Sequence, residues 1–154
     1  MAPRFFGRFE HSLDAKGRII LPARFRGSFD TQAYLSQHHD RCLAVWTPEH
    51  FEKEAATMEA MADSGPQDRN LARFWASGII EVELDRQGRV PIPGYLREFA
   101  RLDTAVLITG VFNRIELWNP TEWVARVGPN EAVLGDSILM TEASPGAVTL
   151  AASE

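Results

Sequence analysis

The sequence predicts an α+β fold built from two like units, which together act as an intrachain pseudo-dimer with flanking helices. The first observation is a repeat: the segment Glu10–Pro22 reads like Glu81–Pro93, without a gap, at an offset of 71 residues. The second is that a Trp-x-Pro follows each copy, beginning at Trp46 and at Trp118. The third is that short strand patterns alternate with capped helical patterns in both copies. Because each unit alone is small for a stable core, the two are expected to share one.

The first copy predicts two short strands joined by a tight turn. Phe9–Leu13 and Arg18–Leu21 have strand-like patterns, and Asp14–Gly17 between them consists of turn residues. An aspartate accepts hydrogen bonds from backbone N–H groups two residues on, and a glycine adopts the left-handed conformation without steric cost. Pro22 ends the second strand. Since proline suits the first turn of a helix, we expect one helical turn at Ala23–Arg26.

A strand and a longer helix are predicted next. Leu43–Trp46 is the strand, and Thr47 followed by Pro48 is typical of a helix N-cap and first helical position. Apolar residues at helical spacing then form one stripe, which predicts a face that packs in the core or against another subunit. The stripe consists of Phe51, Ala55, Met58 and Ala62, with Met61 beside it. Trp46 and Trp118, which end strands before capped helices, are expected in the core.

The second copy repeats this order after a break at residues 63–67. The expected elements are a helix over Asp68–Ser77, strands at Ile79–Leu84 and Arg89–Ile92, a helix at Gly94–Ala100, and a hairpin of Ala105–Thr109 with Ile115–Trp118. Asn119 and Glu122 have the spacing of a capping box, so a further helix is expected to about Val127. Beyond it we expect a short helix near Glu131–Met140 and then a disordered end.

Composition and charge exclude several classes of protein. The single cysteine, Cys42, allows no intrachain disulfide and fits a reducing cytosol. The sequence contains no run of about 18 apolar residues, which a membrane-spanning helix would need. Its N-terminus lacks the apolar core of a secretory signal. The net charge of −5 argues against nucleic acid, yet residues 1–26 carry six Lys or Arg against two acids, and residues 85–101 four against two. Because the local field decides where an anion docks, the two copies remain candidates for binding one.

Basic residues in and just after the two turns are the candidate functional residues. Arg18 and Arg89 directly follow the turn glycine, where a guanidinium can bind guanine in the major groove, into which a two-stranded ribbon fits. Lys16 and Arg86 lie inside the same turns and could contact phosphate. The alternative is that the Asp–Arg ion pair in each turn only stabilises the turn. The basic neighbours favour DNA binding, because such a stabilising pair needs no further positive charge around it. The structural residues of the turns are Asp14, Gly17, Asp85 and Gly88.

Residue spacing argues against a catalytic or metal site. His11, Ser12 and Asp14 include the residue types of a hydrolase triad, but neighbouring strand residues point to opposite faces. The run from His38 to Cys42 offers metal-ligand types, but adjacent histidines in a loop lack the spacing of zinc ligands, so a solvated loop is expected. Each turn motif has a single glycine, which excludes a phosphate-cradling glycine-rich loop. We therefore expect no enzyme activity, no cofactor and no metal.

The two turn motifs, together with the segment Gly110–Trp118 (Gly-Val-Phe-Asn-Arg-Ile-Glu-Leu-Trp), resemble the MraZ family of transcriptional regulators. Chains of this family carry two AbrB-like (SpoVT-AbrB) domains, and the resemblance covers about residues 5–127. It implies a tandem of swapped-hairpin β-barrel units. We place the first DNA-binding unit at residues 8–55, the second at residues 84–127, and a flexible or partly helical tail at residues 128–154.

The resemblance also implies a function. Family membership implies sequence-specific binding of double-stranded DNA at short G-rich direct repeats, and regulation, as a repressor, of the division and cell wall operon. It implies a ring-shaped homo-oligomer, an octamer or larger, in the bacterial cytoplasm on the nucleoid, with no membrane partner. The family's DNA-contacting arginines fall on Arg18 and Arg89, and Lys16 matches the family's first-turn lysine.

Two positions depart from this pattern, and one other function stays open. Gln87 stands where the first copy has Lys16, so positive charge there comes from Arg86. Pro91 replaces an apolar strand residue and lacks an N–H, which predicts an edge or an unpaired position in that strand. Proteins of the AbrB type also include antitoxins that bind a toxin through a flexible tail. The acidic, partly apolar residues 128–154 could serve such a protein-interaction module.

Overall fold

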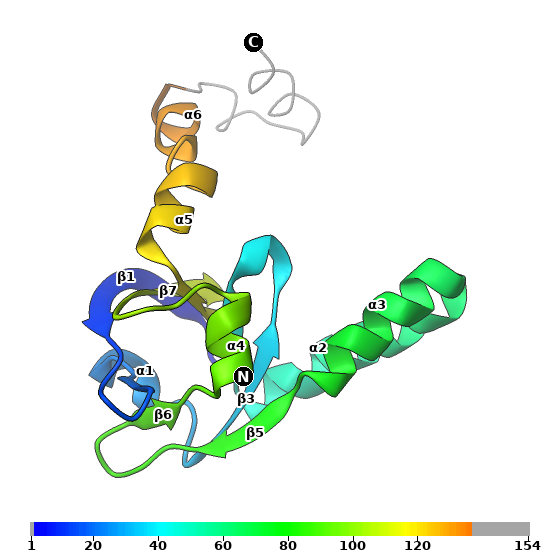
Figure 1. Cartoon of the computed structure of the whole chain (residues 1–154), viewed down its shortest axis with the longest axis horizontal. Coiled ribbons are helices and arrows are strands. Elements are labelled where there is room, and N and C mark those ends of the chain that lie inside the picture. Colours follow the sequence, from blue (N-terminus) through cyan, green and yellow to red (C-terminus); the bar gives the residue numbers. More distant parts are fainter. Residues whose placement is uncertain (1, 137–154) are drawn as a thin grey trace. The chain divides into compact units, whose positions relative to one another are not determined.

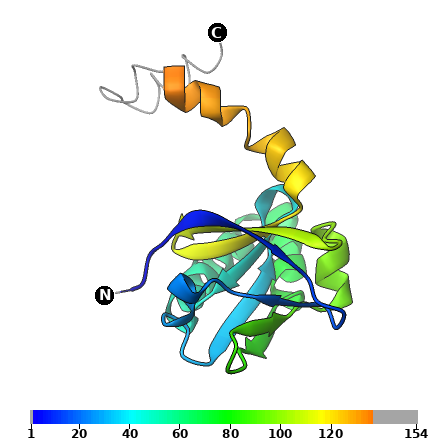
Figure 2. The ribbon, with the colours of Figure 1, turned by 90° about the vertical axis from the view of Figure 1, so that its left-hand side faces the viewer.

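Strands from the two copies are interleaved in the computed structural model, which describes residues 2–136 (Figures 1 and 2). The strands are β1 (Phe5–Ser12), β2 (Arg18–Ile20), β3 (Gln32–Gln37), β4 (Leu43–Trp46), β5 (Ile80–Glu83), β6 (Arg89–Pro91), β7 (Ala105–Phe112) and β8 (Arg114–Trp118). Six of them form one antiparallel sheet in the order β1-β7-β8-β4-β3-β5, and β2 pairs with β6 in a second sheet. β1 of the first copy pairs with β7 of the second, and β3 with β5. Both sheets of this mixed α+β fold therefore need strands of both copies.

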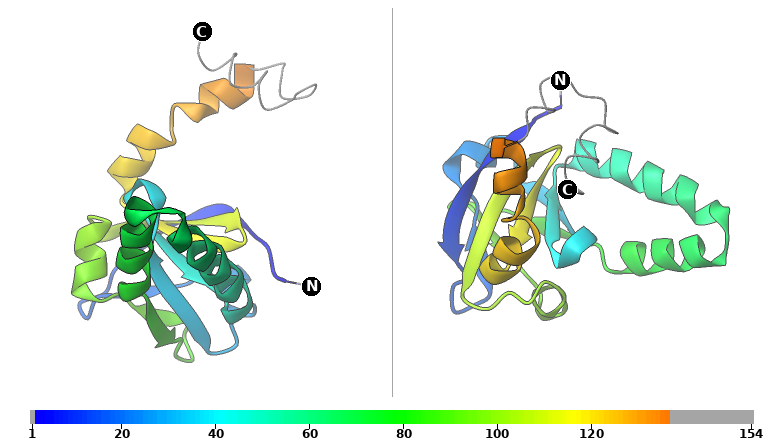
Figure 3. Two further views of the ribbon diagram at one scale, coloured as in Figure 1. Left: turned by 90° about the vertical axis from the view of Figure 1, so that its right-hand side faces the viewer. Right: turned by 90° about the horizontal axis from the view of Figure 1, so that it is seen from above.

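Helices connect and follow these strands. They are α1 (Ala23–Arg26), α2 (Pro48–Met61), α3 (Pro66–Ser77), α4 (Gly94–Phe99), α5 (Pro120–Arg126) and α6 (Asn130–Asp136), with short 3-10 helices at His39–Arg41 and Ala62–Ser64. α2 and α3 lie side by side along much of their length (Figure 3). Within residues 2–136, no helix has the length and apolar character needed to cross a bilayer.

The start of α2 and its apolar stripe follow the sequence prediction. Thr47 is the N-cap, and its Oγ1 accepts a hydrogen bond from a first-turn backbone N–H at 3.2 Å, with Pro48 as the first helical residue. Phe51 of the stripe stacks on the Tyr34 ring, with centroids 4.1 Å apart, and on the Trp75 ring of α3 at 5.9 Å. The stripe therefore packs against β3 and α3.

One hydrophobic core takes residues from both copies. Ile19 and Val90, which the repeat aligns, are both fully buried and lie opposite each other in the β2–β6 ladder. Trp46 and Trp118 are buried as predicted. The indole N–H of Trp46 donates to Ser36 Oγ at 2.8 Å, which satisfies its one polar atom. The apolar part of the repeat thus serves a core that neither copy completes alone.

The expected two-stranded ribbon within one copy is wrong. The strands on either side of the first turn enter different sheets, because β1 pairs with β7 and β2 with β6. A sequence pattern identifies which segments are extended, but it does not specify their partners, and here pairing between copies brings the apolar faces together. The prediction that Pro91 lies at an edge is confirmed, since β6 belongs to a two-stranded sheet.

Two strands extend beyond their predicted limits. β1 begins at Phe5, whose side chain is 1% exposed, rather than at Phe9. β7 continues to Phe112, where a left-handed backbone conformation (φ 61°) permits a tighter connection to β8 than a four-residue loop. The predicted alternation missed both ends, because Gly7 and Gly110 interrupt the apolar pattern there.

The segment from Pro120 onward forms a second compact unit, which is described by itself. In α5, Arg126 pairs with Glu122 at 3.1 Å, one helical turn away. α6 begins at Asn130, one residue before the predicted helix, and its described part ends at Asp136. The predicted continuation to Met140 and the predicted disordered end lie outside the described residues.

Candidate nucleic-acid interface

Asp14 organises the first candidate turn. Its backbone N–H donates to the Arg18 carbonyl at 2.9 Å, and its carbonyl accepts from the Gly17 N–H at 3.0 Å. Its Oδ1 accepts from the backbone N–H groups of Lys16 and Arg18, both at 2.9 Å, and its Oδ2 accepts from Arg18 Nε at 2.8 Å. Gly17 has φ 75°, where glycine avoids the strain of other residues. One carboxylate therefore fixes both the turn backbone and the arginine side chain.

Asp85 organises the second turn with the same set of bonds. Its Oδ1 accepts from the backbone N–H groups of Gln87 at 2.9 Å and Arg89 at 3.0 Å. Its Oδ2 accepts from Arg89 Nε, and Gly88 has φ 79°. The change from Lys16 to Gln87 leaves this geometry intact, because the bond uses the backbone N–H and not the side chain. The two copies thus build equivalent turns with different exposed side chains.

Both turn aspartates are held in the ionised form. Hydrogen bonds from the backbone N–H of Arg18, then from its side chain and from the Lys16 N–H, lower the pKa of Asp14 below its ordinary value. The backbone N–H of Arg89, followed by its side chain and the Gln87 N–H, lowers the pKa of Asp85 in the same way. Each arginine is therefore tied to a permanent negative charge at neutral pH.

Arg18 and Arg89 share the outer face of the β2–β6 ladder. They are two positions apart in the register, and the pair between them, Ile19 with Val90, is fully buried. Because side chains alternate between faces, both arginines point away from the core, with Cα atoms on the order of 7 Å apart along the strands. Their side chains are 26% and 32% exposed. Within each guanidinium only Nε is hydrogen-bonded, and no residue among 2–136 bonds to the two terminal nitrogens.

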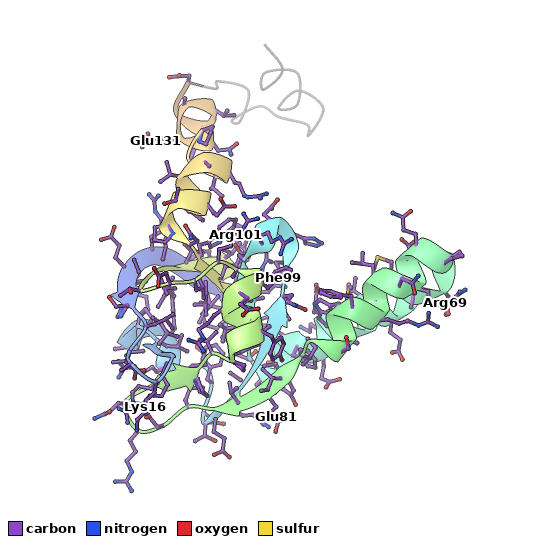
Figure 4. All side chains as sticks on the ribbon, viewed as in Figure 1. Lys16, Arg69, Glu81, Phe99, Arg101 and Glu131 are labelled. Atoms are coloured by element: carbon purple, nitrogen blue, oxygen red, sulfur yellow. The ribbon has the colours of Figure 1, made fainter. Side chains whose placement is uncertain are left out.

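Lys16 and Arg86 are the exposed basic residues of the two turns. Lys16 lies on the first turn, at the edge of the molecule as drawn in Figure 4. Neither side chain has an ion-pair partner in the described part of the chain. Two turns of two copies therefore present four basic side chains, of which two are fixed by aspartates and two are not.

Each turn is also bonded to the other copy through its glycine carbonyl. The Leu21 N–H, which follows β2, donates to the Gly88 carbonyl at 2.9 Å. The Ile92 N–H, which follows β6, donates to the Gly17 carbonyl at 2.9 Å. The two turns lie at opposite ends of the short antiparallel ladder, and each is completed by the strand end of the other copy.

Sequence reasoning assigned no role to Arg26 and Arg97, although the repeat aligns them. The structure places each against the turn of the other copy, Arg26 at Gly88 and Arg97 at Gly17. The signal available in the sequence was their match at the same offset as the turns. Which turn each arginine reaches depends on pairing between distant segments.

The predicted alternatives remain apart in the structure. His11 and Ser12 are consecutive in β1, opposite Val106 and Ala105, so their side chains leave opposite faces of the sheet. No cluster of three or more His, Cys, Asp or Glu side chains within residues 2–136 could hold a metal ion.

The expectation of a fully solvated loop at residues 38–42 is wrong at both its ends. The His38 side chain is 6% exposed, packs edge-on against the Trp46 ring and lies 3.9 Å from Glu116. Burial lowers the pKa of His38 to about 3 and raises the pKa of the buried Cys42 thiol. Only the middle of the segment, His39–Arg41, is exposed. The side chains of His38 and Cys42 are buried because these residues directly adjoin the end of β3 and the start of β4.

Comparison with known proteins shows similarity over most of the chain. A family model described as "MraZ protein, putative antitoxin-like" matches residues 5–74 and 76–127. The chain is 39% identical over 119 residues to the transcriptional regulator MraZ of Moorella thermoacetica, covering 77% of this chain and 83% of the relative. It is 37% identical over 134 residues to that of Acetivibrio thermocellus, covering 87% and 93%. It is 42% identical over 123 residues to that of Lactiplantibacillus plantarum, covering 77% and 84%.

Proposed function

Because the chain belongs to the MraZ family, we propose that it is a transcriptional regulator that binds a specific DNA sequence. The observation that supports this most strongly is the placement of Arg18 and Arg89. Two equivalent arginines stand on one outer face, each oriented by an aspartate and each with its terminal nitrogens unengaged by residues 2–136.

Arg18 and Arg89 have the chemistry to recognise guanine. Bidentate recognition of guanine O6 and N7 requires a planar guanidinium whose donors are already oriented. With Nε held by Asp14 or Asp85, the two terminal nitrogens remain for the base, and little side-chain freedom is left to lose. The Asp–Arg ion pair therefore does more than stabilise the turn, because it orients the arginine for guanine recognition.

Lys16 and Arg86 supply contacts that do not depend on sequence. Both are exposed cations beside an oriented arginine, which suits them to phosphate oxygens. Their attraction weakens as salt rises, because phosphate contacts release counterions. We assign base recognition to the arginines after the glycines, and phosphate binding to the residues within the turns.

One chain makes a small contact, so we propose that several chains bind together. A ring-shaped homo-oligomer, an octamer or larger, would present the same turns to short G-rich direct repeats and raise their effective concentration. Such a complex over a promoter would repress transcription, and the operon of division and cell wall genes is the proposed target. The interleaved strands are then the intrachain form of the swapped-hairpin barrel of AbrB-type dimers.

A footprint tests the proposal. Purified full-length protein is incubated with the DNA upstream of its own reading frame, and protected positions are mapped. We expect protection of short repeats at regular spacing, with guanines in each. Absence of any protected region at low salt, where electrostatic attraction is strongest, would contradict the proposal.

A second function is favoured by one observation. Val124 of α5 and Leu134 of α6 are 67% and 66% exposed, and the matching family model carries an antitoxin-like description. Exposed apolar side chains on short helices are suited to a protein partner. Co-purification of one small protein in fixed proportion, lost when Val124 and Leu134 are replaced by serine, would favour this protein-interaction module.

A further inference from the structure

Arg26 and Arg97 pack against the turn glycines across the two copies. Arg26 ends α1, and its side chain lies against the Gly88 backbone, so that a Cβ added there would be 2.5 Å from Arg26 Cδ. Arg97 of α4 lies against Gly17, where an added Cβ would be 3.1 Å from Arg97 Cζ and 3.2 Å from its Nη1. The absence of a side chain at each glycine is what allows this close approach.

The two arginines differ in how residues 2–136 satisfy them. Arg26 Nε donates to the Leu21 carbonyl at 2.8 Å, whereas Arg97 Nε is buried and finds no hydrogen-bond acceptor in this part of the chain. No carboxylate among residues 2–136 forms an ion pair with either one. A buried guanidinium N–H without an acceptor, as at Arg97, is costly, and an apolar side chain would fill the same space without that cost. Their retention at matching positions points to a role beyond packing.

We propose that Arg26 and Arg97 are positioning residues that act across the copies, Arg97 on Arg18 and Arg26 on Arg89. This inference rests on the proposed DNA binding. Each arginine side chain packs against the turn glycine of the other copy. The carbonyl of the same glycine accepts a backbone hydrogen bond, from the Ile92 N–H at Gly17 and from the Leu21 N–H at Gly88. The turn backbone sets the direction of the arginine that follows it.

Cross-dependence is the distinctive consequence. A change in the first copy, at Arg26, disturbs recognition by Arg89 in the second copy and leaves Arg18 in place. A change at Arg97 does the reverse. A residue that only stabilised its own copy, or the whole fold, would produce neither pattern.

Hydrogen exchange measured by mass spectrometry tests the positioning without DNA. Arg97→Met and Arg26→Met keep an unbranched side chain of similar reach without the guanidinium, so that no large void is created. We expect Arg97→Met to speed exchange in a peptide covering residues 14–18, and Arg26→Met in one covering residues 85–89. Arg73→Ala, which removes an exposed charge on α3, is the matched control and should change neither.

Either of two exchange results overturns the proposal. Faster exchange in the turn of the same copy would show a local role, and equal loosening of both turns would show a general loss of stability. If a methionine variant does not fold, Arg97→Lys and Arg26→Lys repeat the test, because lysine keeps the charge and the aliphatic stem but lacks the planar group. The same crosswise pattern is expected from them.

Double-variant cycles on operator DNA extend the test to function. We expect Arg97→Met alone to weaken binding roughly tenfold, as a misplaced base contact does. In an Arg18→Ala protein the same change should alter affinity by no more than about twofold, and in an Arg89→Ala protein it should keep its full effect. Equal effects in both backgrounds would contradict the proposed pathway.

The salt dependence separates positioning from direct contact. If Arg97 only positions Arg18, the slope of log affinity against log salt stays unchanged in Arg97→Met. A slope smaller by about 0.9 would mean that Arg97 itself contacts a phosphate and would overturn the assignment. If Arg18→Ala and Arg89→Ala leave binding intact, the proposed function fails, but the exchange result still decides whether the arginines position the turns.

Discussion

Arg26 occupies the space beneath Gly88, so the second turn exists in its present form only because residue 88 has no side chain. An added Cβ would lie 2.5 Å from Arg26 Cδ, and the backbone there has φ 79°. Both the close approach and the left-handed conformation require glycine.

Replacing Gly88 by alanine should therefore destabilise the protein. The left-handed conformation alone costs about 1–2 kcal/mol for a residue with a Cβ, and displacement of Arg26 adds to it. Gly27→Ala is the matched control: Gly27 has φ −61°, and a Cβ there meets nothing within 4 Å. Denaturant unfolding should show lower stability for Gly88→Ala and unchanged or slightly higher stability for Gly27→Ala. Equal stability of the two variants would be inconsistent with this packing.

Removal of either turn arginine should weaken and broaden DNA recognition. Arg18→Ala and Arg89→Ala each lose one oriented guanidinium, which should cost about 1–3 kcal/mol per base contact and relax the preference for guanine. Electrophoretic shifts on operator and scrambled DNA measure both effects. Arg73→Ala controls for the loss of one positive charge. Unchanged affinity and unchanged preference in both turn variants would reject the assignment.

Lys16→Gln should change the salt dependence and little else. It gives the first turn the side chain that Gln87 provides in the second, and the bond from the backbone N–H to Asp14 does not need the lysine. We expect the slope of log affinity against log salt to fall by about 0.9, with the preference for operator over scrambled DNA retained. Filter binding at several salt concentrations measures the slope, and a loss of preference would show that Lys16 takes part in base recognition.

Burial of His38 should make the protein less stable as the pH falls from neutral. Its pKa is lowered from 6.5 to about 3 in the folded protein, mainly by burial and next by Arg114 and His39. Between these two values the unfolded chain binds more protons than the folded one, so stability falls with decreasing pH across that window. Thermal unfolding of the native protein and of His38→Gln should show a weaker pH dependence in the variant. A proton NMR titration of His38 with a midpoint above about pH 5 would contradict the lowered pKa.

Local features of the fold were predictable from sequence, and partners were not. Ala23–Arg26 and Leu43–Trp46 form the elements expected of them, and Thr47 caps α2, because capping and strand propensity act over a few residues. Pairing of Arg18–Ile20 with Arg89–Pro91 depends on segments 71 residues apart, which no local pattern specifies. The burial of His38 has the same origin, since Trp46 and Glu116 reach it from other strands.

The candidate site divides in the same way. The repeat alone identified the two turns and their arginines, since matching polar residues outside an apolar pattern indicate a shared need. It also aligned Arg26 with Arg97, but only the interleaved topology shows that each lies at the turn of the other copy. The sequence pattern therefore identifies the exposed turn arginines, Arg18 and Arg89, whereas only the tertiary structure shows that Arg26 and Arg97 pack against the turns.

The fusion of both turns into one chain gives the proposed interface a direction. Two separate identical subunits related by a twofold axis present the same turn twice, and their binding sites are palindromic for that reason. In this chain one end of the ladder carries Lys16 and Pro91, and the other carries Gln87 and Ile20. A DNA-binding surface with unequal ends, as we propose for these turns, would distinguish one orientation of the double helix from the other, and copies of the chain would then bind head to tail along the DNA.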